Sequence, residues 1–186
     1  MAIILASASP RRVELLANAG ISCIVRPTNI AELQNPGEEP RPFAERMARE
    51  KALAAELKSA RDYILAADTV VVVDGQVVGK PGNAADAARM LRMLSARTHD
   101  VITGVCLRGE GFADVRSEST RVQFLELSDA EIGGYVASGE SMDKAGAYGI
   151  QGLASKWIPT IEGDYFNVVG LPVSLVWRML REHGVL

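Results

Sequence analysis

The sequence is poor in cysteine. Its 186 residues include only Cys23 and Cys106, and these have no C-x-x-C spacing. Disulfide frameworks and cysteine-based metal sites need more cysteines at regular spacings, and the sequence offers none. Both residues lie in apolar, strand-like surroundings, so we expect two free thiols buried in the protein.

Clustered positive charge is also missing. The formal net charge is −3, and lysine and arginine form no run or tail. Nucleic acids and anionic membranes are bound through basic surfaces, so the composition argues against both as partners. The tryptophans and tyrosines are not interleaved with basic residues, which argues against stacking on nucleic acid. Any anion site must therefore be built from a few individually placed cations.

Long hydrophobic runs are absent as well. No apolar segment reaches the roughly 18 residues that a transmembrane helix requires. The apolar run at residues 2–6 is too short for a signal peptide, and the nearest arginines follow the run instead of preceding it. We therefore expect a cytoplasmic protein that spans no membrane. The length suits a single domain, 1–186, because about 100–200 residues is the usual range.

Strand-like and helix-like segments alternate along the chain. Apolar runs predict strands near residues 2–6, 21–26, 63–78, 100–109 and 119–127. Helical periodicity predicts helices near residues 10–19, 42–59, 84–94, 129–138 and 173–181. Asp74-Gly75, the strongest short hairpin signal, interrupts the third apolar run. Alternating elements with at least one antiparallel hairpin indicate an α/β fold with a mixed sheet.

Capping signals mark where several helices begin. Ser9 precedes Pro10 in the order expected for an N-cap followed by the first helical residue. Asn83 can cap the third helix, and Ser128 with Glu131 forms a capping box for the fourth. These local signals agree with the periodicity and support the predicted helix starts.

The segment ASASPRR, residues 6–12, joins the first strand to the first helix. Free backbone N–H groups and the helix dipole attract anions to such a position. Ser7 adds a hydroxyl, and Arg11 and Arg12 add cations that the dipole disfavours, so a bound anion would relieve both. The alternative is that Ser9 only caps the helix and the arginines are solvated. The segment matches neither a P-loop nor a Rossmann loop.

Asp68 interrupts the apolar run of the third strand. Burying a carboxylate is costly unless it is paired or binds a metal. One interpretation is a bulge or turn at the end of the sheet. The other is a carboxylate at a strand end that serves as metal ligand or general base. Lys80 follows at the end of the hairpin, next to Pro81, and is either a solvated lysine or part of the same site.

Two further charged residues have weaker signals. Lys51 lies beside the apolar stripe of the second helix, where lysine side chains often cover apolar surface. Glu32 lies in a polar, proline-rich loop and is not distinctive alone. Taken together, the charged residues indicate metal-assisted phosphate chemistry, because cations can hold a polyphosphate and carboxylates can hold a divalent metal. The cations are Arg11, Arg12, Lys51 and Lys80, and the carboxylates are Asp68 and Glu32.

Five motifs follow one another along the chain: LASASPRRVELL, ADTVVVVDGQVVGKP, AARMLRMLSARTHDVITGV, DKAGAYGIQG and NVVGLP. In this order they resemble the motifs of the Maf family of nucleoside triphosphate pyrophosphatases. The resemblance spans nearly the whole chain. It implies hydrolysis of a nucleoside triphosphate to the monophosphate and pyrophosphate, with Mg²⁺ or Mn²⁺. It also implies an elongated, two-lobed molecule with a central cleft, similar to inosine triphosphatase-like folds. Members of the family are often dimeric, so a homodimer is expected.

The resemblance also implies roles for individual residues. Asp68 would accept the proton and share a metal with Glu32, although the loop around Glu32 is less acidic than the family pattern. Substrate would contact Ser7, Arg11, Arg12, Lys51, Thr69, Lys80 and Gln151.

Arg11, Thr69 and Gln151 carry the substrate expectation. They match the branch of the family that acts on dTTP and UTP, and the motifs of the branch that acts on 7-methyl-GTP are absent. We therefore expect hydrolysis of dTTP and UTP, or of modified pyrimidine nucleotides, as house-cleaning of the nucleotide pool. The alternatives are a pyrophosphatase for 7-methyl-GTP or another non-standard nucleotide, and a nucleotide-binding regulator of septum formation.

Overall fold

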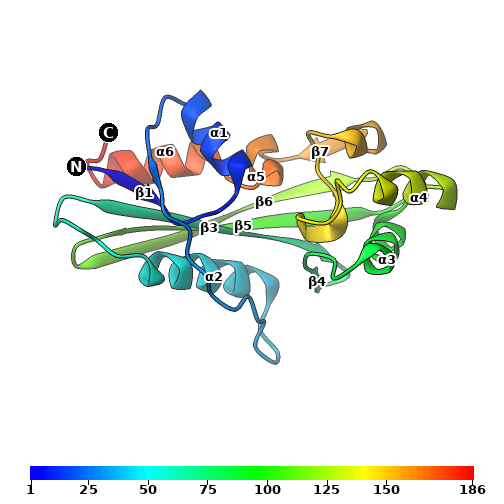
Figure 1. Cartoon of the computed structure of the whole chain (residues 1–186), viewed down its shortest axis with the longest axis horizontal. Helices are drawn as coiled ribbons and strands as arrows, with labels where there is room; N and C mark the ends of the chain where they lie inside the picture. The colour runs from blue at the N-terminus through cyan, green and yellow to red at the C-terminus, as the bar shows by residue number, and fades with distance from the viewer. The chain divides into compact units, whose positions relative to one another are not determined.

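The computed structural model describes residues 1–186 and forms one mixed sheet with helices around it (Figure 1). The strands are Ile3–Leu5 (β1), Ile24–Val25 (β2), Tyr63–Val73 (β3), Gln76–Val78 (β4), Thr98–Gly109 (β5), Phe112–Gln123 (β6) and Thr160–Glu162 (β7). The α-helices are Pro10–Asn18 (α1), Pro40–Ala54 (α2), Ala84–Leu94 (α3), Asp129–Ala137 (α4), Tyr165–Val169 (α5) and Val173–Glu182 (α6). Two short 3₁₀ helices, η1 and η2, span Ala145–Ala147 and Leu153–Trp157.

The sheet contains both parallel and antiparallel neighbours. Its order is β2-β1-β3-β5-β6-β7, and β4 pairs with β3 outside this path. Strand β1 is parallel to both β2 and β3, whereas β3 with β4 and β6 with β7 are antiparallel. The prediction of an α/β fold with a mixed sheet is therefore confirmed.

The chain folds into two compact units. Unit 1 contains residues 1–69, 103–118 and 170–186, and unit 2 contains residues 70–102 and 119–169. The long strands β3, β5 and β6 contribute residues to both units. The elongated shape, the central cleft, the single domain and the similarity to inosine triphosphatase-like folds stay predictions.

Unit 1 has helices on both sides of its strands. Figure 1 shows α1 and α6 on one side and α2 on the other. The approach of α2 is close, because a Cβ on Gly104 of β5 would lie 2.3 Å from the carbonyl oxygen of Ala44. A glycine is therefore required where the helix crosses this strand. The buried core on this side combines alanines of α2 with Ile4, Ile64 and Cys106.

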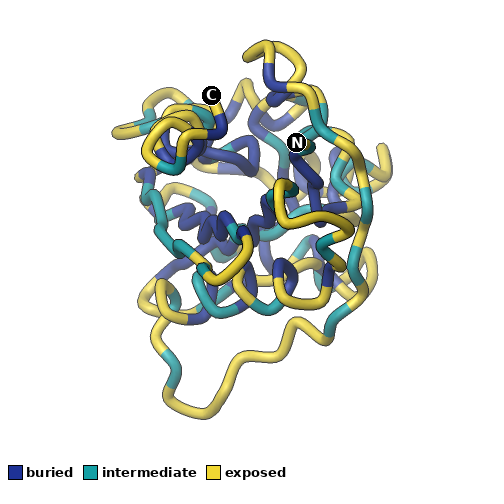
Figure 2. The backbone as a smooth tube through the Cα atoms, turned by 90° about the vertical axis from the view of Figure 1, so that its left-hand side faces the viewer, coloured by how far each residue is buried: buried dark blue, intermediate teal, exposed yellow.

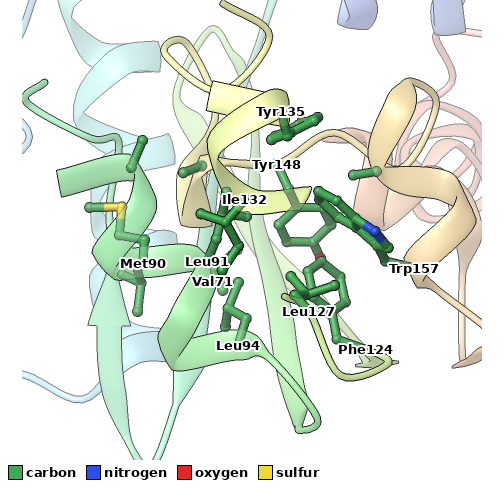
Figure 3. Close-up of a cluster of buried hydrophobic side chains, with 14 of the residues drawn as sticks. Val71, Met90, Leu91, Leu94, Phe124, Leu127, Ile132, Tyr135, Tyr148 and Trp157 are labelled. Atoms are coloured by element: carbon green, nitrogen blue, oxygen red, sulfur yellow. The ribbon is translucent and has the colours of Figure 1, made fainter. Parts of the chain in front are cut away.

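Unit 2 is built around a larger apolar core (Figure 3). Helix α3 contributes Ala87, Met90, Leu91 and Leu94, whose spacing places them on one face of the helix. Phe124, Tyr135, Tyr148 and Trp157 add aromatic rings from β6 onward, and Phe124 lies 4.7 Å from Tyr148 between ring centroids. This core packs α3 and α4 together with the glycine-containing segment 143–152.

Most local signals are confirmed. Asp74 and Gly75 both have positive φ, 51° and 74°, as a tight hairpin turn requires. Asn83 caps α3 through the backbone N–H of Asp86, and both halves of the predicted capping box of α4 are present.

Three local predictions are wrong in detail. Ser9 occupies the N-cap position of α1, but its side chain makes no capping hydrogen bond. Helix α2 begins and ends earlier than predicted. At its C-terminal end, Arg108 donates to the carbonyl oxygens of Ala52 and Ala55, which the shorter helix leaves without partners. Strand β6 begins at Phe112, because polar side chains of its first half find partners on other elements.

The remaining expectations concern the cysteines and the membrane. Both cysteines are free; Cys106 is buried as predicted, but Cys23 is only half-buried. None of the helices combines the length and hydropathy of a membrane-spanning segment.

Candidate active site

A buried lysine joins two carboxylates in unit 1. Lys51 Nζ, from the last turn of α2, lies 2.5 Å from Oδ1 of Asp68 and 2.6 Å from Oε1 of Glu32. Asp68 comes from β3, and Glu32 comes from the loop between β2 and α2, most of which is exposed (Figure 2). Three distant segments therefore meet at one ammonium group.

The structure corrects the position that both sequence interpretations gave Asp68, whereas its role as metal ligand or general base stays a prediction. Asp68 is neither in a turn nor at a strand end, because β3 continues without interruption from Tyr63 to Val73. Asp68 is only 6% exposed, and Lys51 is only 9% exposed. Since a buried charge requires a partner, the pairing explains how a carboxylate is tolerated in an apolar strand.

Arg12 lies beside this pair and is fixed by three acceptors. Its Nε donates to the carbonyl oxygen of Gly170 at 2.8 Å, and its Nη1 donates to Oγ of Ser7 at 3.1 Å. Its Nη2 donates to Oγ1 of Thr69 at 3.2 Å. Arg12 is thus ordered by the protein and not simply solvated, which argues against one of the alternatives left open by the sequence.

The electrostatics of Arg12 reflect its surroundings. Desolvation by burial lowers the pKa of Arg12, the nearby carboxylates of Asp68 and Glu32 raise it, and Arg11 lowers it further. An arginine remains charged under all ordinary conditions, so the guanidinium is a permanent cation. A second cation, Arg11, stands next to it at the start of α1 and is half-buried.

The sequence did not single out two residues that support this arginine. Thr103, fully buried in β5, lies 2.9 Å from Thr69 between hydroxyl oxygens. Gly170 has a φ of 127° and presents its carbonyl oxygen to both Arg12 and Thr69. Both residues lie within motifs that resemble those of the Maf family, and this resemblance was the only sign in the sequence that they belong to the site.

Lys80 and Gln151 belong to unit 2, and both are exposed. Lys80 follows β4, and Gln151 lies in the glycine-containing segment. Within unit 2, the end of the hairpin contacts the glycine-containing segment, because the backbone N–H of Gly146 donates to the carbonyl oxygen of Gly79 at 3.0 Å. Unit 2 therefore joins the hairpin end to the segment that carries Gln151.

The predicted site residues are thus distributed over two units. Unit 1 brings together Ser7, Arg12, Glu32, Lys51, Asp68 and Thr69, with Arg11 next to Arg12 in α1. Their convergence with Lys80 and Gln151 on one nucleotide stays a prediction.

The carboxylates of Asp68 and Glu32 are suited to a divalent metal. Both lie within hydrogen-bonding distance of one cationic atom, Lys51 Nζ, so their oxygens already converge on a single positive charge. No group of three or more histidine, cysteine or acidic residues forms a metal cage in this chain. Mg²⁺ typically uses one or two carboxylates and completes its shell with water and substrate phosphates, and this pair fits that pattern.

The fold and site define an α/β protein with a buried acid–lysine pair and an ordered arginine at the start of a helix. The chain belongs to the Maf family, because the family model described as "Maf-like protein" matches residues 2–183.

Relatives from several bacteria match over nearly their whole length. A dTTP/UTP pyrophosphatase of Koribacter versatilis (strain Ellin345) is 55% identical over 186 residues, which cover 100% of this chain and 96% of the relative. The enzyme of the same name from Syntrophomonas wolfei subsp. wolfei is 53% identical over 182 residues, 97% of this chain and 96% of the relative. That from Geobacter metallireducens is 48% identical over 186 residues, 99% and 97% respectively.

Proposed function

We propose that this chain is a nucleoside triphosphate pyrophosphatase that hydrolyses dTTP and UTP to the monophosphate and pyrophosphate. The observation that carries the proposal is the buried Asp68, held by Lys51 beside the ordered guanidinium of Arg12. The relatives named dTTP/UTP pyrophosphatase, at 48–55% identity over 97–100% of this chain, support the same activity and substrate class.

Asp68 is the proposed proton acceptor. A water molecule attacks the α-phosphorus, a new P–O bond forms, and the carboxylate takes the proton that the water loses. The bond from the α-phosphorus to the bridging oxygen breaks, and pyrophosphate leaves with the bonding electrons. Lys51 contacts Oδ1 of Asp68 and so fixes the orientation of the carboxylate within its strand.

Arg12 and its neighbours are proposed to hold the phosphates. The guanidinium is oriented before substrate binds, because Ser7, Thr69 and Gly170 already accept its hydrogen bonds. Preorganised cations stabilise the charge that develops in phosphoryl transfer, which is usually the largest catalytic contribution. Arg11 and Lys80 are proposed to add positive charge along the same polyphosphate.

Asp68 and Glu32 are the residues proposed to hold Mg²⁺ or Mn²⁺. When bound, the metal would neutralise charge on the phosphate oxygens and polarise them. The Lys51 ammonium between the two carboxylates limits how much further positive charge they can accept. We therefore expect metal affinity to depend strongly on the negative charge that the substrate brings.

Selection of the base is assigned to Arg11, Thr69 and Gln151. Thymine and uracil share a carbonyl oxygen at a position where cytosine has an amino group, so a few polar side chains can distinguish them. A site built to hydrogen-bond the edge of thymine or uracil leaves polar groups unpaired when cytosine binds, which makes discrimination between the bases strong. The homodimer, the cytoplasmic location and the role in cleaning the nucleotide pool remain part of this proposal.

A panel of nucleotides tests the function directly. Pyrophosphate release would be measured for dTTP, UTP, dCTP, 7-methyl-GTP and ITP, with and without Mg²⁺ or Mn²⁺. The proposal expects metal-dependent turnover with dTTP and UTP as the best substrates. A preference for 7-methyl-GTP or ITP would contradict the assignment of dTTP and UTP as substrates. Binding without turnover of any nucleotide would favour a regulatory protein over an enzyme.

A further inference from the structure

Glu140 organises the glycine-containing segment of unit 2 from outside that segment. It follows α4, and its carboxylate uses both oxygens: Oε1 accepts from the hydroxyl of Tyr135 at 2.9 Å, and Oε2 accepts from the backbone N–H of Leu153 at 3.1 Å. The hydroxyl of Tyr135 in turn accepts from the backbone N–H of Gly149 at 3.1 Å. One carboxylate and one phenol thus hold the backbone amide of Gly149, within the segment, and that of Leu153, directly after it.

These two amides flank Gln151. Gly149 lies two positions before it and Leu153 two positions after it, so the backbone is held on both sides. Gln151 itself is exposed, whereas the neighbouring Ile150 is buried, at 8% exposed. The anchoring contacts therefore present one polar side chain outward from a fixed backbone.

Gly152 shows how closely the carboxylate approaches. A Cβ at this position would lie 2.1 Å from Oε1 of Glu140 and 2.4 Å from its Cδ. Only glycine allows the carboxylate to sit against the backbone next to Gln151. A Cβ on Gly149 would likewise meet Lys144, 2.7 Å from its Cε, and Lys144 Nζ donates to the carbonyl oxygen of Glu140 at 2.6 Å.

Tyr135 is a suitable intermediary. Its ring is buried against Trp157, with 5.1 Å between ring centroids, and both rings belong to the core in Figure 3. Burial and the bond to Glu140 raise the pKa of Tyr135, so the phenol keeps its proton and donates to the carboxylate at any physiological pH. Titration of the phenol therefore does not interrupt the hydrogen bond that Glu140 accepts from Tyr135.

We infer that Glu140 is a positioning residue that acts through Tyr135 and the flanking amides to fix Gln151, and so sets the preference for dTTP and UTP over dCTP. This inference rests on the proposed function, in which Gln151 contacts the base. Glu140 itself need not touch the nucleotide.

The test compares the ratio of kcat/KM for dTTP to that for dCTP in four proteins: the wild type, Glu140→Gln, Gln151→Ala and the double variant. The substituted amide at position 140 offers one acceptor oxygen where the carboxylate offers two, so an anchoring bond is lost with little change in volume. We expect the ratio to fall about tenfold in each single variant, which corresponds to about 1.4 kcal/mol. In the double variant it should fall no further than in Gln151→Ala.

This lack of additivity separates positioning from general damage, because two residues that act through one contact do not add. The inference is overturned if Glu140→Gln keeps the wild-type ratio, or if it lowers the ratio by the same factor in the Gln151→Ala background. Tyr135→Phe, which removes only the hydroxyl, decides by the same two criteria if Glu140→Gln does not fold. Glu126→Gln, which changes an exposed glutamate of the same unit, is the matched control and should leave the kcat/KM ratio unchanged.

The wild type distinguishes this inference from the proposed function. A wild-type protein that hydrolyses dTTP and dCTP equally well would contradict the proposed substrate, and the inference would fail with it. A wild-type preference for dTTP that Gln151→Ala removes but Glu140→Gln does not would leave the proposed function intact and overturn the inference alone.

Discussion

Lys51 Nζ lies 2.5 Å from Oδ1 of Asp68, although Lys51 belongs to the last turn of a helix and Asp68 lies inside a buried strand. The buried carboxylate of Asp68 is tolerable in this position because the Lys51 ammonium pairs with it, and Lys51 is paired with Glu32 as well. The pair therefore links stability to the proposed chemistry, because the group that would accept the proton is fixed by a bond that the fold itself needs.

Replacing Lys51 by methionine should destabilise the protein. The substitution keeps the volume but leaves the Asp68 carboxylate buried without its ammonium partner, which typically costs about 3–5 kcal/mol. Urea unfolding at pH 7 would measure the loss. Lys58→Met, at an exposed position of the same unit, is the control and should stay within about 0.5 kcal/mol of wild type.

The double variant Lys51→Met with Asp68→Asn gives a sharper result. Removing both charges should recover part of the lost free energy of unfolding, since no uncompensated carboxylate remains. If the double variant loses more unfolding free energy than the two single variants together, the unpaired charge is not the source of the destabilisation.

Changing Arg12 to lysine should reduce kcat/KM for dTTP roughly 100-fold. Lysine keeps the charge but cannot reproduce the planar arrangement of donors that reaches Ser7, Thr69 and Gly170. Steady-state kinetics would measure the change, with Arg61→Lys as an exposed control in the same unit. Unchanged kcat/KM in Arg12→Lys would show that charge alone, without orientation, is what the site requires.

Gly104→Ala should disturb the site from a distance. The new Cβ would lie 2.3 Å from the Ala44 carbonyl oxygen and 2.7 Å from the Glu45 amide nitrogen, so α2 must move. Because α2 carries Lys51, we expect a loss of about 1–3 kcal/mol in unfolding free energy together with reduced turnover. Gly133→Ala, in α4 with open space around its Cα, should instead stabilise slightly. Equal effects from the two substitutions would contradict the close approach of α2.

His99 makes stability depend on pH. Burial lowers the pKa of His99 from 6.5 to about 4, so the folded protein keeps the ring neutral while the unfolded chain becomes protonated below pH 6.5. Folding stability should therefore fall as pH decreases from 6.5 to 4, by roughly 3 kcal/mol in total, and level off below that. Unfolding free energies across this range should have a smaller slope in His99→Gln. An identical slope in the variant would assign the dependence to other groups.

The sequence predicts those features that depend on neighbouring residues. The Asp74-Gly75 turn, the Asn83 cap and the capping box at Ser128 all follow from short-range chemistry and are present. Ser9 is the instructive failure, because its position is right but its side chain does not cap the helix. Residue preference at a helix start does not determine which hydrogen bond forms.

The contacts of the site could not be predicted in the same way. Arg12 and Gly170 are separated by 158 positions, and Lys51 and Asp68 by 17, so their meeting depends on how strands and helices pack. The charged residues of the sequence indicated which side chains could form the site, but not that Lys51 would lie between Glu32 and Asp68. The interior position of Asp68 was also missed, because an acid in an apolar strand has no local explanation until its partner is known.

Turnover of dTTP by Asp68→Asn is the most direct test of the proposed chemistry. The substitution keeps the shape of the side chain and removes the proton acceptor, so kcat should fall at least about 100-fold while the circular dichroism spectrum remains that of the folded wild type. Asp129→Asn, which removes an exposed carboxylate of α4, should retain wild-type turnover. A folded Asp68→Asn protein that releases pyrophosphate from dTTP at the wild-type rate would contradict the role assigned to Asp68.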